Sequence, residues 1–268
     1  MINPQPIITL LTDFGSQDYF AAAMKGVILS INPAAQIVDI THELPPHDIH
    51  AAAFNLVATY EDFPANTIHV VVVDPGVGST RRAVLIECAG QFFVGPDNGI
   101  FSWVCEREVN YRAIHLMNEK FFRHPVSTTF HGRDIFAPVA AALSNGVAPQ
   151  EFGPAIESLV HLDSLKPKIL SDGAIEASII YIDRFGNCIT NLTREILCDD
   201  LSQAKLVVGG REISSFRRYY REAEEREVFC VIGSAGFLEV VAANRSAAAI
   251  LDARCGQTVS VVSQSNGK

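Results

Sequence analysis

The chain has 268 residues, of which 48% are hydrophobic and 19% are charged. This composition is that of a folded protein with a sizeable core, and it excludes an intrinsically disordered chain. The formal net charge is −9, and the sequence has no stripe of basic residues with interleaved aromatics, so a nucleic-acid partner is not expected.

The first part of the chain alternates between short apolar runs and amphipathic segments. Apolar runs over residues 7–11 and 36–40 predict two strands. Apolar side chains at helical spacing predict a helix over residues 18–31, and a second helix is expected over residues 49–60 with Asp48 as its N-cap. Strands that alternate with helices in this way predict a doubly wound, mostly parallel α/β sheet.

A third apolar run, IHVVVV at residues 68–73, predicts a strand that is buried on both faces of the sheet. It ends at Asp74, and Pro-Gly-Val-Gly follows at once, so the strand runs into a tight loop. Ligands of open α/β sheets bind just beyond the carboxyl ends of strands, which puts Asp74 at a candidate site within reach of Arg81. An ordinary ion pair between these two side chains is an equally good interpretation of this stretch alone.

A hairpin and a further helix complete the first domain. Residues 82–88 and 91–94 are expected to form the hairpin, after which the turn sequence Gly-Pro-Asp-Asn-Gly occupies residues 95–99. The sequence Phe-His-Gly-Arg-Asp at residues 130–134 precedes an alanine-rich helix that is expected to end near Gly146.

The character of the chain changes after residues 152–172, a stretch of prolines and charges with little periodicity. Short β runs follow, at a spacing typical of a small antiparallel barrel. These predicted strands cover residues 174–182, 187–192, 205–208, 227–232, 237–241 and 258–262. We therefore expect an N-terminal α/β domain over residues 1–165 and a C-terminal antiparallel β-barrel domain over residues 173–268. The mixed-charge run at residues 217–227 is interpreted as a solvated face or loop.

Polar residues stand at the ends of predicted strands in both domains. Asp13, Asp74 and Arg81 are expected on loops at one edge of the first sheet, together with His131. In the second domain, the sequence around Asp183 repeats the arrangement of strand, aspartate and glycine turn.

The sequence lacks the generic signatures of other site classes. It has no Walker phosphate loop, and no Gly-x-Gly-x-x-Gly follows the first strand, which tells against a conventional nucleotide site. His42, His47 and His50 form a loose cluster without a carboxylate at ligand spacing, so no metal is expected. Six cysteines without a Cys-x-x-Cys pair favour reduced thiols and a cytoplasmic protein. Neither a signal peptide nor a membrane-spanning segment is predicted.

Seven segments of the chain, in order, resemble the S-adenosylmethionine hydroxide adenosyltransferases, the water-using relatives of fluorinating and chlorinating enzymes. The segments are TLLTDFGSQDYFAAAMKG, IVDITHELPPHDIHAA, VVVVDPGVGSTRR, FVGPDNGIFS, TFHGRDIFAP, YIDRFGNCITN and GSAGFLEVVAAN. The resemblance covers nearly the whole chain. It implies an α/β domain followed by a β-barrel, and a homotrimer that holds the substrate between one subunit's N-terminal domain and a neighbour's barrel.

The resemblance also implies an activity, the hydrolysis of S-adenosylmethionine to adenosine and methionine without a cofactor. Water attacks C5′ from behind the C5′–S bond, and methionine leaves as a neutral thioether that needs no general acid. The family's catalytic Asp, Arg and His correspond to Asp74, Arg81 and His131, with Arg82 as an alternative to Arg81. The guanidinium favours hydroxide, and the His–Asp pair orients the water and takes up its proton.

Substrate-binding residues are implied in both domains. Asp13 fits the family's ribose ligand, because a carboxylate can accept hydrogen bonds from two hydroxyls, and Asp183 fits the ligand of the substrate's ammonium group. Further contacts to adenine or methionine are implied for the barrel residues Phe185, Asn187, Ser234, Phe237 and Glu239.

Three alternatives stay open at this point. A halogenating relative would keep the fold and the substrate, but that branch has tyrosine at the position of Asp74 and a residue other than histidine at that of His131. A non-catalytic sensor of S-adenosylmethionine or adenosine would need Asp13 and Asp183, but not Asp74, Arg81 and His131 together. A metal-dependent hydrolase would be sensitive to chelators.

Overall fold

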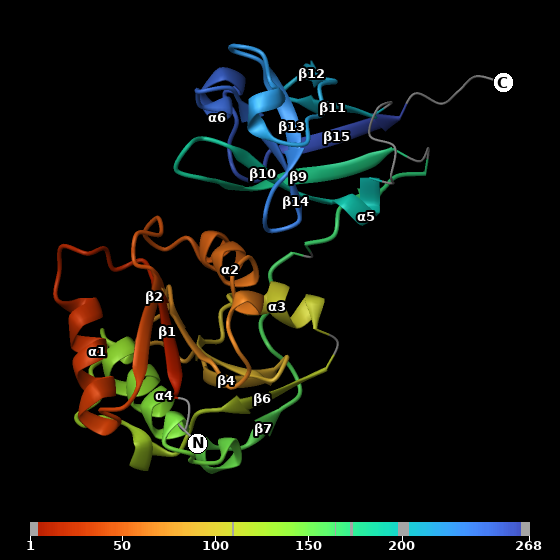
Figure 1. The fold of residues 1–268 in the computed structure, drawn as a ribbon. Helices are drawn as coiled ribbons and strands as arrows, with labels where there is room; N and C mark the ends of the chain where they lie inside the picture. Colours follow the sequence, from red (N-terminus) through yellow and green to blue (C-terminus); the bar gives the residue numbers. More distant parts are fainter. Residues whose placement is uncertain (1–4, 109, 164, 172–173, 198–203, 264–268) are drawn as a thin grey trace. The chain divides into compact units, whose positions relative to one another are not determined.

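The structure, a computed structural model, describes residues 5–108, 110–163, 165–171, 174–197 and 204–263. The chain separates into two compact units, Met1–Asp163 and Ser164–Lys268. The first unit is an α/β domain and the second is a barrel-like antiparallel sheet, so the predicted fold class is confirmed (Figure 1). Within the described ranges, no helix has both the length and the apolar character that crossing a membrane requires.

The α/β domain is built on one mixed sheet. Its strands are β1 (Ile7–Thr12), β2 (Gln36–Thr41), β3 (Ile68–Val72), β4 (Ala83–Cys88), β5 (Gln91–Pro96), β6 (Tyr111–His115) and β7 (Ala155–Ile156). They lie in the order β2-β1-β3-β5-β4-β6-β7. The pairs among β2, β1, β3 and β5 are parallel, as the alternation of strands and helices predicts. The predicted hairpin of β4 and β5 then begins an antiparallel half that β6 and β7 complete.

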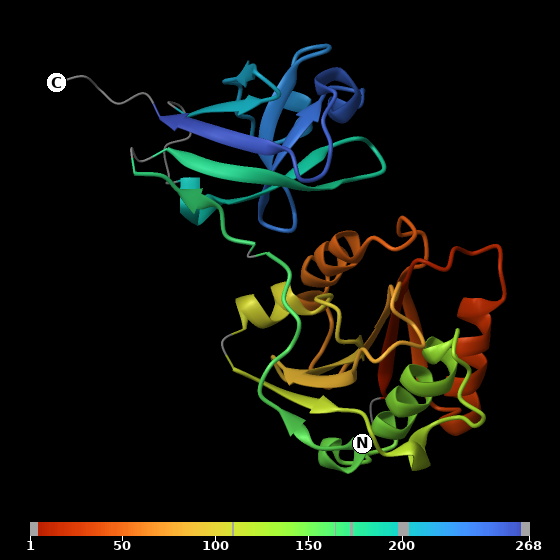
Figure 2. The ribbon, with the colours of Figure 1, turned by 180° about the vertical axis from the view of Figure 1, so that it is seen from behind.

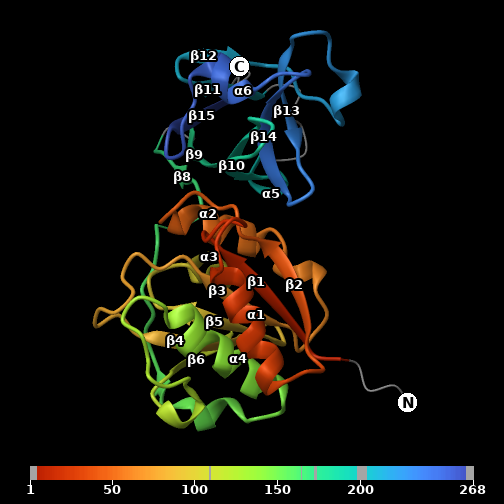
Figure 3. The ribbon, with the colours of Figure 1, turned by 90° about the vertical axis from the view of Figure 1, so that its left-hand side faces the viewer.

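Helices cover both faces of this sheet. The described ones are α1 (Phe20–Ile31), α2 (Ile49–Val57), α3 (Ser102–Arg107) and α4 (Ala137–Ser144), with short turns η1 (Tyr60–Asp62), η2 (Glu119–Phe121), η3 (Gly132–Phe136) and η4 (Pro149–Phe152). Helices α1 and α4 pack against each other on the face that is in front in Figure 3, and α2 packs against α3. Asp48 caps α2 as predicted, because its side chain accepts a hydrogen bond from the N–H of Ala51 at 2.9 Å.

Helix α2 ends earlier than the predicted residue 60. Thr59 leaves the helical conformation, with φ of −128°, and its hydroxyl donates to the carbonyl oxygen of Asn55 at 2.7 Å. The N–H of Thr59 donates to the carbonyl oxygen of Leu56 at 3.1 Å, so the hydroxyl takes the Asn55 carbonyl that a helical N–H would have used.

Strand β3 is the centre of the domain, and all five of its residues are buried. Ile68, Val70 and Val72 join the core that lies under α1 and α4, and the alternating residues His69 and Val71 face the other side of the sheet. Gly95 of β5 approaches so closely that a Cβ there would stand 2.3 Å from the carbonyl oxygen of Val71. The sheet therefore fixes the carboxyl end of β3, where the loop with Asp74 begins.

The second unit is an antiparallel sheet that is nearly closed into a barrel. Its elements are β8 (Lys168–Ile169), β9 (Ile175–Ile182), β10 (Cys188–Thr193), α5 (Arg194–Leu197), β11 (Ala204–Val208), β12 (Arg211–Ile213), η6 (Tyr220–Glu222), β13 (Val228–Ile232), β14 (Phe237–Ala242), α6 (Ala247–Leu251) and β15 (Thr258–Ser263). Strand β9 pairs with β15 through its first half and with β10 through its second, and Figure 2 shows β9 and β15 side by side. Beyond β12, Phe216 forms a bridge to Cys230 of β13, which brings the two ends of the sheet together.

Candidate active site

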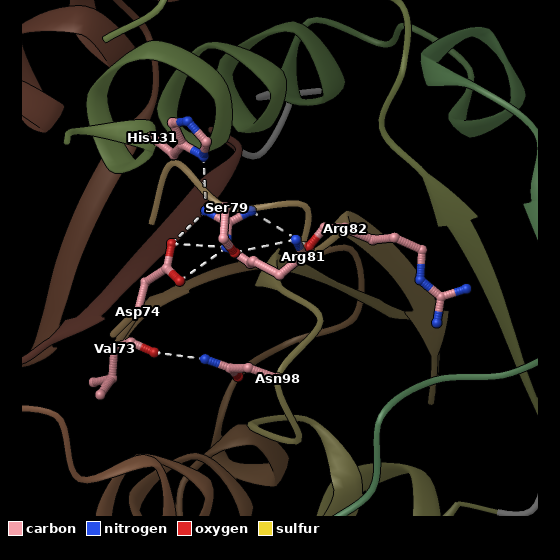
Figure 4. A network of polar contacts seen from close by, with 7 residues as sticks. All are labelled: Val73, Asp74, Ser79, Arg81, Arg82, Asn98 and His131. Carbon is pink, nitrogen blue, oxygen red and sulfur yellow. Dashed lines mark hydrogen bonds and ion pairs between the residues drawn. The ribbon is translucent and has the colours of Figure 1, made fainter. Parts of the chain in front are cut away.

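The loop between β3 and β4 brings Asp74 and Arg81 into a buried ion pair (Figure 4). Nε of Arg81 donates to Oδ1 of Asp74 at 2.8 Å and to Oδ2 at 3.0 Å, and Nη2 of Arg81 also contacts Oδ2. The side chains are only 5% and 10% exposed. Burial of these charges is tolerated because the guanidinium neutralises the carboxylate and its donors match the carboxylate geometry.

His131 joins this pair from a separate segment, at the start of the π-helical turn η3. Its Nδ1 lies 2.7 Å from Nη2 of Arg81. A guanidinium has donors and no acceptor, so Nδ1 accepts and the ring proton is on Nε2. Burial, and then the positive charge of Arg81, hold the pKa of His131 below its usual 6.5, although Asp74 opposes this. His131 is therefore a neutral imidazole at pH 7.

A glycine fastens the two segments together. Gly78, in the loop after Asp74, has φ of +77°, and a Cβ on it would stand 2.2 Å from the carbonyl oxygen of Thr128. Only glycine permits this approach, which brings the Asp74 loop against the segment that leads to His131.

Arg82 points away from the network (Figure 4). Its Nε donates to Oδ2 of Asp97 at 2.7 Å, and its Nη2 donates to the carbonyl oxygen of Ser158 at 2.8 Å. Of the two neighbouring arginines, the one that contacts both Asp74 and His131 is Arg81.

A cavity of about 290 Å³ lies beside the network. Three of the residues predicted to form a site, Asp13, Asp74 and His131, line it together. Its apolar lining includes the packed rings of Phe14, Phe20 and Phe130. The cavity thus combines an apolar wall with polar groups that converge from three loops, the usual composition of a small-molecule site.

Asp13 is held in place at this cavity by the loop after β2. Its Oδ2 accepts a hydrogen bond from the N–H of His47 at 2.8 Å. His47 lines the same cavity and has a φ of 67°, which is unusual for a residue other than glycine. The hydroxyl of Thr12 bonds Nδ1 of His42 at 2.8 Å, and the N–H of Gly15 donates to the carbonyl oxygen of His42 at 2.7 Å. The turn that carries Asp13 is therefore fixed on both sides.

The three histidines of the predicted loose cluster serve different neighbours. His42 bonds Thr12, His47 lines the cavity, and the ring of His50 faces that of Trp103 at 6.2 Å. Across the part of the chain that the structure describes, no three His, Cys, Asp or Glu side chains converge as metal ligands would. The sequence gives no signal that His47 lines a cavity, because its position there depends on the tertiary contact with Asp13.

The barrel has a cavity of its own, about 1140 Å³ in volume. Predicted residues on its lining are Asp183, Phe185, Asn187, Ser234 and Glu239. Asp183 organises the turn after β9, because its carboxylate accepts from the N–H groups of Phe185 and Asn187 at 2.9 and 2.8 Å and from Nδ2 of Asn187 at 2.9 Å. The ring of Phe185 is 77% exposed and free to meet a ligand. Phe237, in contrast, is 2% exposed and does not line this cavity.

Glu239 gains a partner that the sequence did not indicate. The hydroxyl of Tyr220 donates to its Oε2 at 3.1 Å. Burial, and then the charge of Asp183, raise the pKa of Glu239, while the bond from Tyr220 lowers it. Tyr220 and Arg221 belong to the mixed-charge run at residues 217–227, so this run contributes to a cavity lining as well as to a solvated face. It has no periodicity that could have revealed this.

Fold and site together define an α/β domain with a buried Asp–Arg–His network, joined in one chain to a barrel with an acidic cavity. Residues 8–153 match the SAM hydroxide adenosyltransferase N-terminal domain, and residues 177–260 match the C-terminal domain of the same family. The chain belongs to the SAM hydroxide adenosyltransferase family.

Individual relatives agree with this assignment. The chain is 37% identical to the (R)-S-adenosyl-L-methionine hydrolase of Methanocaldococcus jannaschii, over 87% of each chain. It is 38% identical to the protein of the same name from Thermus thermophilus, over 90% of this chain and 93% of the relative. A crystal structure of a conserved protein from Thermotoga maritima superposes with a TM-score of 0.88 at 33% identity, over 95% of this chain and 99% of the other. The fluorinase of an Actinoplanes species matches at 29% identity over 72% of this chain.

Proposed function

We propose that this protein hydrolyses S-adenosylmethionine to adenosine and L-methionine. The observation that carries the proposal is the buried contact chain from Asp74 through Arg81 to His131, beside a cavity that Asp13 also lines. The names of the M. jannaschii and T. thermophilus relatives support the same reaction.

In the proposed reaction the oxygen of water forms a bond to C5′ as the C5′–S bond breaks. The bonding electrons pass to sulfur, which leaves as the neutral thioether of methionine. The attacking water must lose a proton, and Asp74 is the natural acceptor, because a carboxylate has about four lone-pair positions and Arg81 uses only some of them. Arg81 stabilises the negative charge that builds on the attacking oxygen. The neutral ring of His131 holds Arg81 through Nδ1 and keeps a donor at Nε2.

The remaining roles are divided between the two domains. Residues 1–165 carry the water-activating side chains, and Asp13 binds the ribose hydroxyls from the same cavity. Residues 173–268 supply contacts to the rest of the substrate, with Asp183 as the ligand of its ammonium group. Phe185, Asn187, Ser234, Phe237 and Glu239 complete these contacts, and Phe237 requires a rearrangement to reach a ligand.

The complete site is proposed to form in a homotrimer, between one subunit's α/β domain and a neighbour's barrel, in the cytoplasm and without a cofactor. Arg81, rather than Arg82, is the active arginine in this proposal, since Arg82 is engaged with Asp97.

Water is favoured over halide as the nucleophile by the polarity around the network. A halide site is small, apolar and poor in proton acceptors, whereas this cavity is lined by the carboxylates Asp13 and Asp74 and by His131. Arg81 balances the charge of Asp74, but the carboxylate can still accept a proton. A water nucleophile has a proton to lose and a halide has none, so a proton acceptor here is useful only for water.

Chromatography of a reaction with S-adenosylmethionine tests the proposal. Equal amounts of adenosine and methionine, independent of added chloride, fluoride or chelator, are expected. A 5′-halo-adenosine product would assign the protein to the halogenating branch, and loss of product with chelator would indicate a metal-dependent hydrolase. Tight binding without product would leave a sensor and refute the proposed reaction.

A further inference from the structure

The 74–81 loop carries two of the proposed catalytic residues, one at each end. It contains two glycines and must hold Arg81 at bonding distance from Asp74, which lines the cavity. Such a loop keeps one geometry only if the backbone on both sides of it is fixed. The residues that fix it lie in the turn of residues 97–99, which directly follows β5.

The turn holds the first end of the loop through Asn98. Nδ2 of Asn98 donates to the carbonyl oxygen of Val73 at 2.9 Å, one residue before Asp74 (Figure 4). The Oδ1 of Asn98 accepts from the N–H of Ile100 at 3.2 Å, so both ends of this side chain amide are engaged. Strand β3 ends at Val72, so no neighbouring strand in the described ranges pairs with the Val73 carbonyl. The Asn98 amide supplies the hydrogen bond that this carbonyl needs.

Asp97 holds the second end of the loop. Its N–H donates to the carbonyl oxygen of Arg82 at 3.0 Å, and its Oδ2 accepts from Nε of Arg82 at 2.7 Å. The same carbonyl oxygen of Arg82 lies 3.4 Å from Nη1 of Arg81. Asp97 is 5% exposed, so its ion pair with Arg82 is shielded from water on the carboxylate side.

The same carboxylate also binds the last segment of the α/β domain. Oδ1 of Asp97 accepts from the N–H of Val160 at 2.8 Å, and Nη2 of Arg82 donates to the carbonyl oxygen of Ser158 at 2.8 Å. Further along, the N–H of Leu162 donates to the hydroxyl of Ser102 at 2.8 Å. The 158–163 segment, which leads directly into the barrel unit, is therefore fastened to the turn that fastens the loop.

We propose that Asp97 and Arg82 form a positioning anchor that couples the seating of the 158–163 segment to the alignment of Arg81 with Asp74. One buried carboxylate makes both contacts. Oδ2 of Asp97 accepts from Arg82, the residue after Arg81, and Oδ1 accepts from Val160 in the 158–163 segment. Neither residue touches the proposed reacting atoms. The anchor acts through Arg81, and it gives Arg82 a role that differs from that of its neighbour. The catalytic part of this inference rests on the proposed hydrolysis.

Two substitutions break the anchor with little change of shape. Asp97→Asn keeps an oxygen for Val160 and removes the charge that holds Arg82, and Arg82→Gln removes the guanidinium from the other side. Each is expected to lower kcat roughly tenfold, because a small misalignment of catalytic groups is costly, while KM changes less than about twofold. The double variant is expected to be no slower than either single variant, since all three break one unit. Arg107→Gln, which breaks the ion pair to Glu61 in the same domain, is the matched control and should keep the parent kcat.

Hydrogen exchange of the protein without substrate tests the anchor independently of activity. Exchange should accelerate together in residues 74–82 and 158–163 of Asp97→Asn and Arg82→Gln, and in neither segment of the Arg107→Gln control. Acceleration in the 158–163 segment alone, with the loop unchanged, would overturn the coupling. So would a parent kcat in Asp97→Asn, or additive losses in the double variant. If the parent protein forms no adenosine, the proposed function fails, and the exchange result still decides whether the anchor exists.

Discussion

The cavity of the α/β domain and the cavity of the barrel use carboxylates in opposite ways. Asp74 is buried against a guanidinium, so its charge is balanced before any ligand arrives. In the barrel, burial and the charge of Asp183 raise the pKa of Glu239, whose described hydrogen-bond partner is the neutral hydroxyl of Tyr220. The first arrangement suits a group that must keep one geometry while a proton moves. The second leaves negative charge to be met by a cationic substrate group.

The largest expected effect is on the balanced network. Asp74→Ala and His131→Ala should each lower kcat by roughly a hundredfold or more, because groups that position or accept a proton contribute factors of this size. The dissociation constant for S-adenosylmethionine, measured by calorimetry, should change far less. Asp62→Ala, which removes an exposed carboxylate of the same domain, is the control. If Asp74→Ala and His131→Ala both kept the parent kcat, the Asp74–Arg81–His131 network would not be catalytic, and the contrast with the barrel cavity would be wrong.

Acid should inactivate the enzyme through the same network. His131 is neutral because burial and Arg81 lower its pKa below 6.5, and protonation would set a positive ring against the Arg81 guanidinium. The value of kcat is therefore expected to be constant above pH 6.5 and to fall as the pH drops through the lowered pKa, about tenfold per unit below it. A midpoint above 6.5 in the pH profile would contradict this assignment.

Acid should also separate the stabilities of the two domains, since all eight histidines lie in the first 163 residues. His69 is fully buried, bonds Thr9 at 2.8 Å, and has its pKa lowered by burial from 6.5 to about 4. The unfolded chain therefore takes up this proton first. The contribution of neutral His69 to the free energy of unfolding of the α/β domain is fully present above pH 6.5. It is lost progressively as the pH falls toward 4, by about 2 kcal/mol at pH 5.

Denaturant titrations monitored by fluorescence of Trp103, the single tryptophan, report on the α/β domain and check this prediction. The unfolding midpoint should fall between pH 7 and pH 5. In a His69→Gln variant, which cannot be protonated at this site, that fall should shrink. An equal acid sensitivity in the variant and the parent would contradict it.

A smaller effect is expected from the ribose position. Asp13→Ala should raise KM about tenfold with a lesser change in kcat, because it removes charged hydrogen bonds to the substrate rather than a group that acts on water. Initial rates over a range of S-adenosylmethionine concentrations measure both constants. An unchanged KM and dissociation constant would count against the ribose role.

The smallest effect is expected in the barrel. Glu239→Gln keeps an oxygen that can accept from the Tyr220 hydroxyl but removes the negative charge. The dissociation constant for S-adenosylmethionine should therefore rise about threefold, as for other partly solvated charge pairs. Glu212→Gln, on the outer strand β12 and paired with Lys205 at 2.7 Å, is the control and should bind like the parent. A loss of turnover at saturating substrate in Glu239→Gln would place barrel residues in the chemistry and remove the contrast between the cavities.

Local sequence predicts the framework of the first cavity well. The apolar run before Asp74 and the Pro-Gly sequence after it indicate a buried strand and a tight loop, and β3 and the 74–81 loop follow that pattern. The cap at Asp48 and the β4–β5 hairpin are equally local features. They are predictable because neighbours in sequence determine them.

The partners of the polar side chains are not local. Arg81 and Arg82 are adjacent, and the pairing of β4 with β5 decides which of them faces Asp97. The proton position on His131 follows from a contact with a residue fifty positions away. Tyr220 reaches Glu239 from a charged run without periodicity. Tertiary contacts of this kind have no signal in a single sequence. The strand-end pattern indicates Asp13, Asp74, Arg81 and His131 as candidates, and only the resemblance implies their roles.

The most direct test of the central claim is a reaction in water enriched in ¹⁸O, with mass spectrometry of the nucleoside product. We expect adenosine with one ¹⁸O atom at its 5′ oxygen and unlabelled methionine in equal amount, because the water oxygen bonds to C5′ and the C5′–S bond breaks. Label in the amino-acid product, or a nucleoside that keeps its sulfur, would mean attack at another carbon. That result would contradict the roles given to Asp74, Arg81 and His131.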